Sequence, residues 1–376
     1  MRNFIQKEMG RIKNDRVYLA LIFFAPILSL VLLASIYTNE IIRDIPVAVV
    51  DLDNSVLSRK VAFYIDSSPS MMITKRCKSV EEVEMLIKGG DVQAGFIFPH
   101  DMEKDVKTNK LTSVTVLKNT INIVTSNVLL KDASTIIKTV SGGITVKKIL
   151  AAGNGQDKAI AMANPVEVHS SPLFNSNYSY EQFLVPGLFL FFIQISLMLA
   201  GVMAFNRNRF EKINSFAELL YKSGLHLALG MVFQIVSLLV ILPAFSIPLT
   251  GNYFQLFFMF GLFSIASFLP GAAISLFIDD LQTAAEYVMF FNTPAFIFSG
   301  LTFPLWSMPA LHRIFAEIIP LTHFMEAFIR FGFMDLTPDY YSIQTLKLFG
   351  FVLIPAIVIA YKLSRDNKST GVQENV

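Results

Sequence analysis

Six apolar segments, each long enough to cross a lipid bilayer, constrain this chain more than any other feature of its sequence. A helix needs about 20 apolar residues to span the hydrocarbon core of a membrane. The six segments are residues 17–37, 183–205, 224–246, 253–277, 284–303 and 344–361. Because backbone polar groups in lipid must be satisfied within the protein, such segments are helical. We therefore predict an α-helical polytopic membrane protein with six transmembrane helices.

The charge content of the chain agrees with this class. Charged residues make up 16% of the sequence, whereas soluble domains carry about a quarter. The net charge of +2 is too small to indicate a polyanionic partner, so we expect no nucleic-acid binding. The single cysteine, Cys77, excludes an internal disulfide, and the sequence has no CxxC motif for metal binding.

The first apolar segment follows a basic N-terminus and could be either a membrane helix or a cleaved signal. Segment 17–37 is longer than the 7–15 residues that are usual for the apolar core of a signal peptide, and no A-x-A pattern follows it. We interpret it as a retained helix, with the cleaved signal as the alternative. In the preceding residues, Ile5, Met9 and Ile12 share one helical face, which predicts that 1–16 is an interfacial helix on the inner leaflet.

A long polar stretch, 38–182, separates the first two apolar segments and has the composition of a folded domain. Short β-rich runs cover 45–50, 92–98 and 113–117, and the proline-free stretch 121–152 predicts a long helix. Residues 79–88 predict another helix, with Ser79 as its N-cap and the pair Gly89-Gly90 as its glycine stop. The alternation of strands and helices predicts a small α/β domain inserted between transmembrane helices 1 and 2.

Orientation follows from the basic residues, which are enriched in cytoplasmic loops. Lysine and arginine concentrate in 1–16, in the loop 206–222 and in the tail 362–376. Both termini are therefore expected in the cytoplasm, and 38–182 is expected to be extracytoplasmic. The remaining helices, together with the hairpin that follows the fifth, occupy 183–361.

Motifs for catalysis are missing from the sequence. There is no G-x-x-x-x-G-K-[ST] loop for ATP, no H-E-x-x-H and no G-x-S-x-G, and the five histidines are scattered. The stretch Asp51–Ser55 does not match a calcium loop, because Val56 and Ala62 occupy the positions that need Gly and Glu. We interpret Asp53 or Ser55 as a helix cap instead. We expect no catalytic, cofactor-binding or metal-binding residue, and hence no enzyme.

Two blocks of sequence resemble a known family, the ABC-2-type permeases, which are the membrane subunits of bacterial drug and polymer exporters. The first block is 46–55, P-V-A-V-V-D-L-D-N-S, followed by G-F-I-F-P at 95–99. It resembles the start of the large external domain in the drug-exporter branch. The second block is S-G-L-T-F-P at 299–304, followed by I-P-L-T-H at 319–323 and by Arg330. It resembles the family's hairpin between the fifth and sixth spans.

The resemblance implies a permease subunit of an exporter in the bacterial inner membrane, moving a hydrophobic or amphipathic substrate such as a drug, a lipid or an envelope component. It implies a partner ABC ATPase that holds ATP and Mg, a second permease subunit, identical or related, and contact with membrane lipid; a periplasmic adaptor stays open. It also places an exit hairpin at 304–330. The hairpin residues so implied are Ser299, Gly300, Pro304, Pro309, Pro320, His323 and Arg330. For Arg330 we leave two partners open, Glu326 and a lipid phosphate.

Coupling to the ATPase needs a cytoplasmic contact, and 206–222 is the loop best suited to it. Members of the family often carry an acidic-x-acidic-x-Gly-Thr pattern here, but this chain lacks the Gly-Thr pair. If helical, the loop would present an apolar patch beside two carboxylates. The predicted coupling residues are Glu211, Phe216, Glu218, Leu219 and Leu220. The alternative is that the patch packs on the protein's own helices.

Four polar residues lie at membrane depth, and a different function also stays open. Gln194, His226, Gln234 and Asn292 could line a transport route or bond helix to helix, and we favour helix contacts. The alternative function is a membrane-anchored receptor or assembly factor with a ligand-binding external domain. No cytoplasmic loop is long enough to hold a signalling domain, so we favour the permease.

Overall fold

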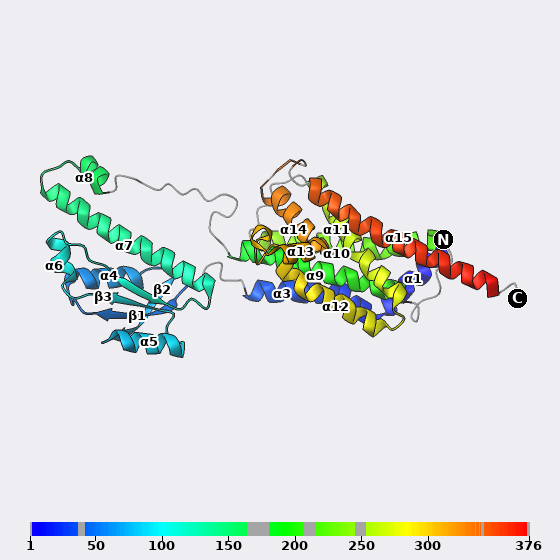
Figure 1. Cartoon of the computed structure of the whole chain (residues 1–376), viewed down its shortest axis with the longest axis horizontal. Coiled ribbons are helices and arrows are strands. Elements are labelled where there is room, and N and C mark those ends of the chain that lie inside the picture. Colours follow the sequence, from blue (N-terminus) through cyan, green and yellow to red (C-terminus); the bar gives the residue numbers. More distant parts are fainter. Residues whose placement is uncertain are drawn as a thin grey trace. The chain divides into compact units, whose positions relative to one another are not determined.

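The computed structural model describes residues 2–36, 42–163, 180–206, 216–244, 253–334, 336–337, 339 and 342–373. Within it the chain forms two compact units. A helical unit comprises Met1–Thr38 and Pro172–Val376, and an α/β unit comprises Asn39–Ser171 (Figure 1). The described residues are mostly helical, as expected for a helical membrane protein.

The longer helices of the helical unit are mainly apolar, whereas α1 is polar and basic. Its N-terminal part contains α1 (Arg2–Asn14), α2 (Arg16–Leu19), the π-helical η1 (Ala20–Phe24) and α3 (Ala25–Ile36). Its second part contains α9 (Tyr180–Phe205), α10 (Phe216–Ala244), α11 (Tyr253–Phe277), α12 (Leu281–Phe298), the 3-10 turn η2 (Leu305–Ser307), α13 (Ala310–Glu317), α14 (Pro320–Phe328), the π-helical η3 (Ile329–Phe333) and α15 (Ser342–Gln373).

Three helices among the described residues are long and apolar enough to cross a membrane. They are Leu184–Phe205, Phe254–Phe277 and Ser342–Arg365, which coincide with the second, fourth and sixth predicted spans. A shorter apolar helix, Arg16–Ser29, lies in the first predicted span. The third and fifth predicted spans coincide with α10 and α12. The total of six membrane crossings stays a prediction.

The centre of the helical unit is the crossing of α9 and α11, where the two backbones touch. A Cβ atom built on Gly201 would lie 2.3 Å from the carbonyl oxygen of Phe268, and one built on Gly271 would lie 2.0 Å from that of Met198. Small residues permit this close approach, which is how apolar helices gain packing contacts in lipid. Phe189 of α9 and Phe263 of α11 are fully buried in the core that precedes these glycines along both helices.

The α/β unit is built on a four-stranded sheet in the order β2-β1-β3-β4. The strands are β1 (Ile45–Asp51), β2 (Met71–Cys77), β3 (Ala94–Phe98) and β4 (Thr115–Lys118). Strand β1 pairs in parallel with β2 and β3, whereas β4 is antiparallel to β3. The helices are α4 (Val56–Asp66), α5 (Val80–Gly89), α6 (Met102–Lys107), α7 (Ile123–Ala151) and α8 (Gln156–Ala163).

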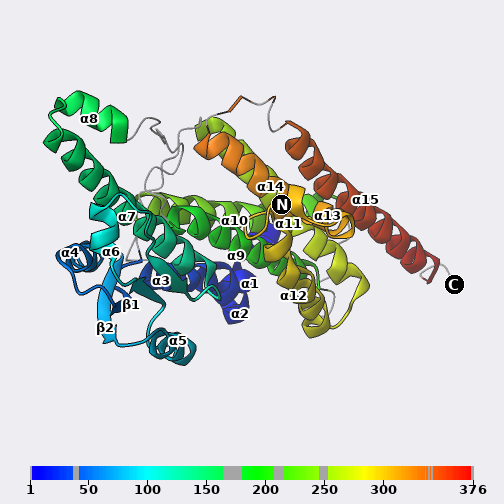
Figure 2. The same ribbon diagram turned by 60° about the vertical axis from the view of Figure 1, so that its left-hand side comes forward.

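Helices cover both faces of this sheet, which explains why β1 is an almost continuous apolar run. Val47 and Val49 point into a core shared with α4, α6 and α7. Ala48 and Val50 point into a second core under α5. Figure 1 shows α5 on the opposite side of the sheet from α4 and α7, and α5 also lies apart from both helices in the turned view (Figure 2).

The helix boundaries of this unit follow from their capping residues. Ser55 forms a reciprocal capping box with Ser58 at the start of α4, and Asp51 accepts a 2.8 Å hydrogen bond from the Ser58 hydroxyl. Ser79 caps α5, which ends at Gly90 in the left-handed conformation, φ +83°. Of the two predicted caps, Asp53 and Ser55, the structure contains Ser55. The predicted cap at Ser79 and the glycine stop are also confirmed, although the helix includes Gly89 and ends at Gly90.

Candidate functional site

A buried charged cluster joins the N-terminal helix to α10 at one end of the helical unit. The carboxylate of Glu8 lies 3.3 Å from Nε2 of His226 and 3.6 Å from Nζ of Lys222. Glu8 and Lys222 are each 2% exposed and His226 is 1% exposed. The other ring nitrogen, Nδ1, is hydrogen-bonded to the hydroxyl of Tyr18. A neutral imidazole with its proton on Nε2 satisfies both contacts, donating to Glu8 and accepting from Tyr18.

The surroundings of Glu8 keep its carboxyl group ionised. Burial raises its pKa, but the hydrogen bond with His226 and the positive charges of Lys222 and Arg11 lower it further than burial raises it. The net pKa therefore lies below the ordinary value for glutamate. A charged group removed from water in this way is stable only with its partners in place. The cluster thus fastens α1 to α10 through charge as well as through packing.

Several further contacts bring other helix ends to the end of the unit that holds this cluster. The Lys222 ammonium lies 5.9 Å from the ring centroid of Phe205, the last residue of α9. The next residue, Asn206, donates a 2.9 Å hydrogen bond to the carbonyl of Asp279 in the turn between α11 and α12. Lys362, in the C-terminal part of α15, lies over the ring of Phe277 at the end of α11. Figure 1 shows α1 and the C-terminal part of α15 at this end.

The predicted coupling residues fall partly on the first turns of α10, beside the cluster. The helix begins at Phe216 and includes Leu219, so the part of this loop from Phe216 onward is helical. Glu218 is half-buried and Leu220 is 56% exposed, two residues before Lys222. Glu211 lies outside the described residues. Their role as a contact for a partner stays a prediction.

Sequence reasoning singled out His226 but missed its partners Glu8 and Lys222. The signal for Glu8 is its place on the N-terminal helix, because it lies three residues after Ile5 and four before Ile12, on the same face. Ile12 is buried. A carboxylate within an apolar stripe is costly unless it is paired. That spacing alone indicates a buried partner, although it does not say which residue.

The exit-hairpin residues lie together at the other end of the unit, in the segment between α12 and α15. Ser299 caps the end of α12, and Gly300 has a left-handed φ of +84°. Each predicted proline precedes or opens a short helical piece. Pro304 comes before η2, Pro309 comes before α13, and Pro320 is the first residue of α14. Proline suits such positions because it needs no partner for an N–H group.

Two carboxylates tie this hairpin to the first turns of α15. Glu317 forms a 2.6 Å ion pair with Lys347, and its carbonyl accepts a 2.9 Å hydrogen bond from Nε2 of His323. Glu326 lies 2.5 Å from Arg330 and accepts a 2.6 Å hydrogen bond from Gln344. Of the two partners left open for Arg330, the structure contains the pair with Glu326.

The polar groups at membrane depth bond helix to helix, as favoured from the sequence. Gln194 of α9 donates a 2.7 Å hydrogen bond to Asn292 of α12, and both side chains are fully buried. Gln234 of α10 accepts a 2.9 Å hydrogen bond from Ser264 of α11. In the part of the chain that the structure describes, no group of three His, Cys, Asp or Glu side chains could hold a metal ion.

Apolar helices of membrane-spanning length, with ionisable clusters gathered at the ends of the helical unit, define this chain as a helical membrane protein. The sequence model of the family described as ABC-2 family transporter protein matches residues 16–361. The chain therefore belongs to this family, as the resemblance predicted. Its members are membrane components of ABC transporters, are not themselves catalytic, and normally work with an ATPase partner. A comparison with curated proteins gives no match.

Proposed function

We propose that this chain is the permease subunit of an ATP-driven exporter that moves a hydrophobic or amphipathic substrate out of the cytoplasm or the inner membrane. The family match over 16–361 is the observation that carries the proposal. A drug, a lipid or an envelope component would suit the apolar helices of such a pathway. ATP and Mg would bind the partner ATPase, because this sequence has no phosphate-binding loop.

In the proposed topology, the end of the helical unit that holds the Glu8 cluster faces the cytoplasm of a bacterial cell. Contacts bring together at this end the N-terminal helix, the start of α10, the turn after α11 and the later part of α15. Described basic residues gather here. They are Lys7, Arg11, Lys13, Arg16, Lys222, Lys362 and Arg365. Fewer lie at the hairpin end, where Arg313, Arg330 and Lys347 are found, so the positive-inside rule supports this orientation.

The same orientation makes the α/β unit extracytoplasmic. Its two ends, near 39 and 171, follow and precede segments of the helical unit. The basic residues of 1–16 come before α3 in the chain and would lie on the cytoplasmic side. If 17–37 crosses the membrane, the residues that follow it would lie on the outer side. This unit would be the part available to a periplasmic adaptor.

Free energy would enter through the start of α10. Leu220 and Glu218 are on the first turns of this helix, and Leu220 exposes its side chain. Lys222, two residues after Leu220, forms a buried ion pair with Glu8. A displacement of the first turns of α10 by a bound ATPase would therefore be passed directly to α1, because the buried ion pair resists separation.

The pathway would form between two permease subunits. Apolar side chains of α3 and α12 are exposed in the single chain, among them Val31, Leu32, Phe290 and Ile297. Lipid covers part of such a surface, and a second permease, identical or related, would cover the rest. Cross-linking in native membranes should trap a permease pair. Transport by a monodisperse single subunit in liposomes would contradict this part of the proposal.

Transport in vesicles of known orientation tests the proposed function. The full chain is co-expressed with its ATPase, and inside-out membrane vesicles receive an apolar fluorescent dye, a fluorescent lysolipid or a hydrophilic sugar. ATP should drive uptake of the dye or the lysolipid, but not of the sugar, and a hydrolysis-deficient ATPase should abolish it. Uptake only into right-side-out vesicles, or uptake that is independent of ATP, would overturn the proposal.

A further inference from the structure

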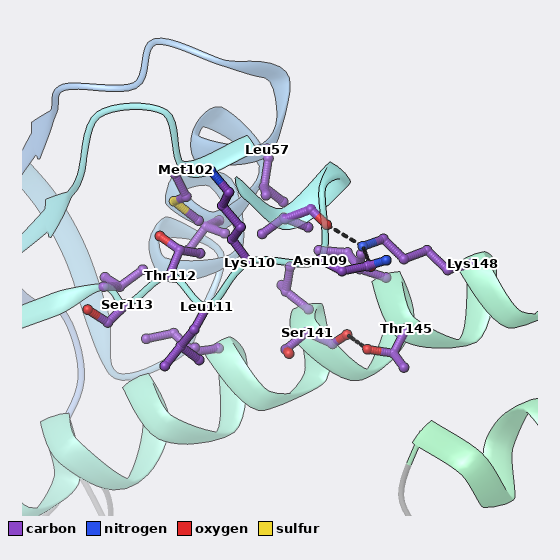
Figure 3. Close-up of a pocket in the computed structure, with 16 residues that line it drawn as sticks. Leu57, Met102, Asn109, Lys110, Leu111, Thr112, Ser113, Ser141, Thr145 and Lys148 are labelled. Carbon is purple, nitrogen blue, oxygen red and sulfur yellow. Dashed lines mark hydrogen bonds between the residues drawn. The ribbon is translucent and has the colours of Figure 1, made fainter. Parts of the chain in front are cut away.

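The α/β unit contains a cavity of about 650 Å³ between α7, α4, α6 and the loop 108–114 (Figure 3). Ligand sites for small molecules usually measure about 300–1,000 Å³. The cavity lies wholly within this unit and shares no residue with the charged cluster or the exit hairpin of the helical unit.

One long wall of the cavity is a single face of α7. Ile137, Val140 and Ile144 follow one another at helical spacing, and Lys148 comes four residues after Ile144 on the same face. The distance from the first to the last of these positions is about 16 Å along the helix axis. Their side chains are apolar for most of this length and basic only at its end. This wall is therefore apolar along most of its length and charged at one end. An elongated amphiphile, with an apolar chain and a charged head, has the same arrangement.

The opposite wall is also mostly apolar. It is formed by residues of α4, α6 and the loop that follows α6, namely Leu57, Val61, Met102, Val106, Leu111 and Val114. Leu111 is 98% exposed. In Figure 3 it extends from the loop toward α7. A leucine left in water at the rim of an apolar cavity gains free energy when an apolar ligand covers it.

The charge of the lining favours an anion. Two lysines, Lys110 and Lys148, line the cavity, and no aspartate or glutamate does. The ammonium of Lys148 donates to the carbonyl of Val106 and, at 2.7 Å, to Oδ1 of Asn109 (Figure 3). An ammonium has three donors, so these two contacts fix its position and leave one donor for a ligand.

We propose that this cavity binds a single-chain amphipathic carboxylate. The alkyl chain would lie along Ile137, Val140 and Ile144, and the carboxylate would accept a hydrogen bond from Lys148. A neutral lipid would leave the positive charge at the end of the cavity unmatched. A polyanion would find only two lysines and an apolar wall. The proposal goes beyond the transport function, since binding here requires neither ATP nor a partner chain.

Photo-labelling of the full chain tests the site. The protein is placed in phosphatidylcholine nanodiscs without any ATPase and is illuminated with hexadecanoate that carries a diazirine on its chain. The matched neutral probe is hexadecanol with the same diazirine. Mass spectrometry should find adducts in 106–114 and 137–148, formed at a lower concentration of the carboxylate than of the alcohol. Unlabelled hexadecanoate should compete.

Matched variants distinguish the site from general partition into lipid. Lys148→Gln should raise the half-saturating concentration of the carboxylate about tenfold, because one charge-assisted hydrogen bond is lost. Lys148→Arg should retain binding. Lys147→Gln removes the same charge from the exposed neighbouring position, which does not line the cavity, and should change nothing.

A variant that fills the cavity keeps the test valid even where Lys148→Gln folds poorly. Ser141 is exposed on α7 and lines the cavity, so Ser141→Trp should block labelling while the melting temperature stays near that of the wild type. Equal labelling by the acid and the alcohol would overturn the proposal. So would adducts confined to the helical unit, or labelling that all variants leave unchanged.

Discussion

Oε1 of Glu8 in α1 lies 3.6 Å from Nζ of Lys222 in α10, and both side chains are almost completely buried. Removing one member of a buried ion pair commonly costs about 3–5 kcal/mol, because the other charge stays buried. Glu8→Ala and Lys222→Ala should each lower the melting temperature of the purified permease clearly. They should also weaken the stimulation of the partner ATPase, measured as phosphate release.

A double variant separates loss of charge pairing from loss of packing. In Glu8→Leu, Lys222→Met no unpaired charge is left between the two positions, so much of the stability should return. Lys13→Ala removes an exposed lysine from the same N-terminal helix and serves as the control. Single and double variants of equal stability would show that the pair does not hold α1 to α10.

The close contact between α9 and α11 leads to a second prediction. Gly271→Ala would place its Cβ 2.0 Å from the carbonyl oxygen of Met198, a backbone atom that cannot move alone. The helices must separate, so we expect less monodisperse protein in detergent and a lower melting temperature. Gly350→Ala is the matched change on α15, where a Cβ would have no neighbour within 4 Å. It should be neutral or slightly stabilising, by up to about 1 kcal/mol. Equal effects at both positions would contradict close packing of α9 on α11.

Thiol labelling tests which side of the membrane holds the α/β unit. Ser141 is exposed, so Ser141→Cys in a Cys77→Ser background should react with an impermeant maleimide added outside intact cells. The native Cys77 is a useful contrast because it is buried, and burial, together with the nearby Glu82, raises the pKa of its thiol. Less thiolate is then present at neutral pH, so Cys77 should react slowly, and faster as the pH rises. Labelling of Ser141→Cys only from the cytoplasmic side would reverse the proposed topology.

A substitution in the predicted exit hairpin should affect transport but not stability. Arg330 and Glu326 form an ion pair in which both side chains keep part of their exposure. Such pairs contribute about 0–1 kcal/mol to stability. Arg330→Ala should therefore leave the amount and melting temperature of the protein nearly unchanged while lowering ATP-driven export severalfold. Arg330→Lys retains the charge and should recover part of the export. Loss of the protein from the membrane would instead indicate a purely structural role.

The elements predicted from sequence are those whose signal is local. Strand β1 is predicted from its β-rich apolar run, and α5 from its N-cap Ser79 and the glycine stop Gly89-Gly90. Strand β2 was missed. Its sequence, M-M-I-T-K-R-C, is apolar only at its start, and three of its residues in a row are exposed. It is an edge strand held by pairing with β1, and such pairing cannot be read from the strand itself.

The candidate site shows the same limit. The hairpin prolines and Gly300 were predicted from a resemblance, and their structural roles follow from residue type. The Glu8 cluster depends on α1 meeting α10, which only tertiary packing decides. Its individual members gave weak local signals, namely a carboxylate in an apolar stripe and a histidine at membrane depth. The sequence could indicate that each needs a partner, but not that they are partners of each other.

The final prediction concerns entry of free energy at the start of α10. Helix α10 begins at Phe216, so the predicted coupling residues Phe216, Leu219 and Leu220 belong to its first turns. Phe216→Ala, Leu219→Ala should reduce binding of the ATPase, or its stimulation, while insertion into the membrane stays normal. The matched control is Val232→Ala, Leu239→Ala, which removes two exposed apolar side chains from the same helix at membrane depth. Co-purification and phosphate release measure both effects. If the Phe216→Ala, Leu219→Ala variant binds the ATPase and exports as well as the wild type, this segment is not the coupling element. The N-terminal helix and the turn between α11 and α12 would then be the remaining candidates at the end proposed to face the cytoplasm.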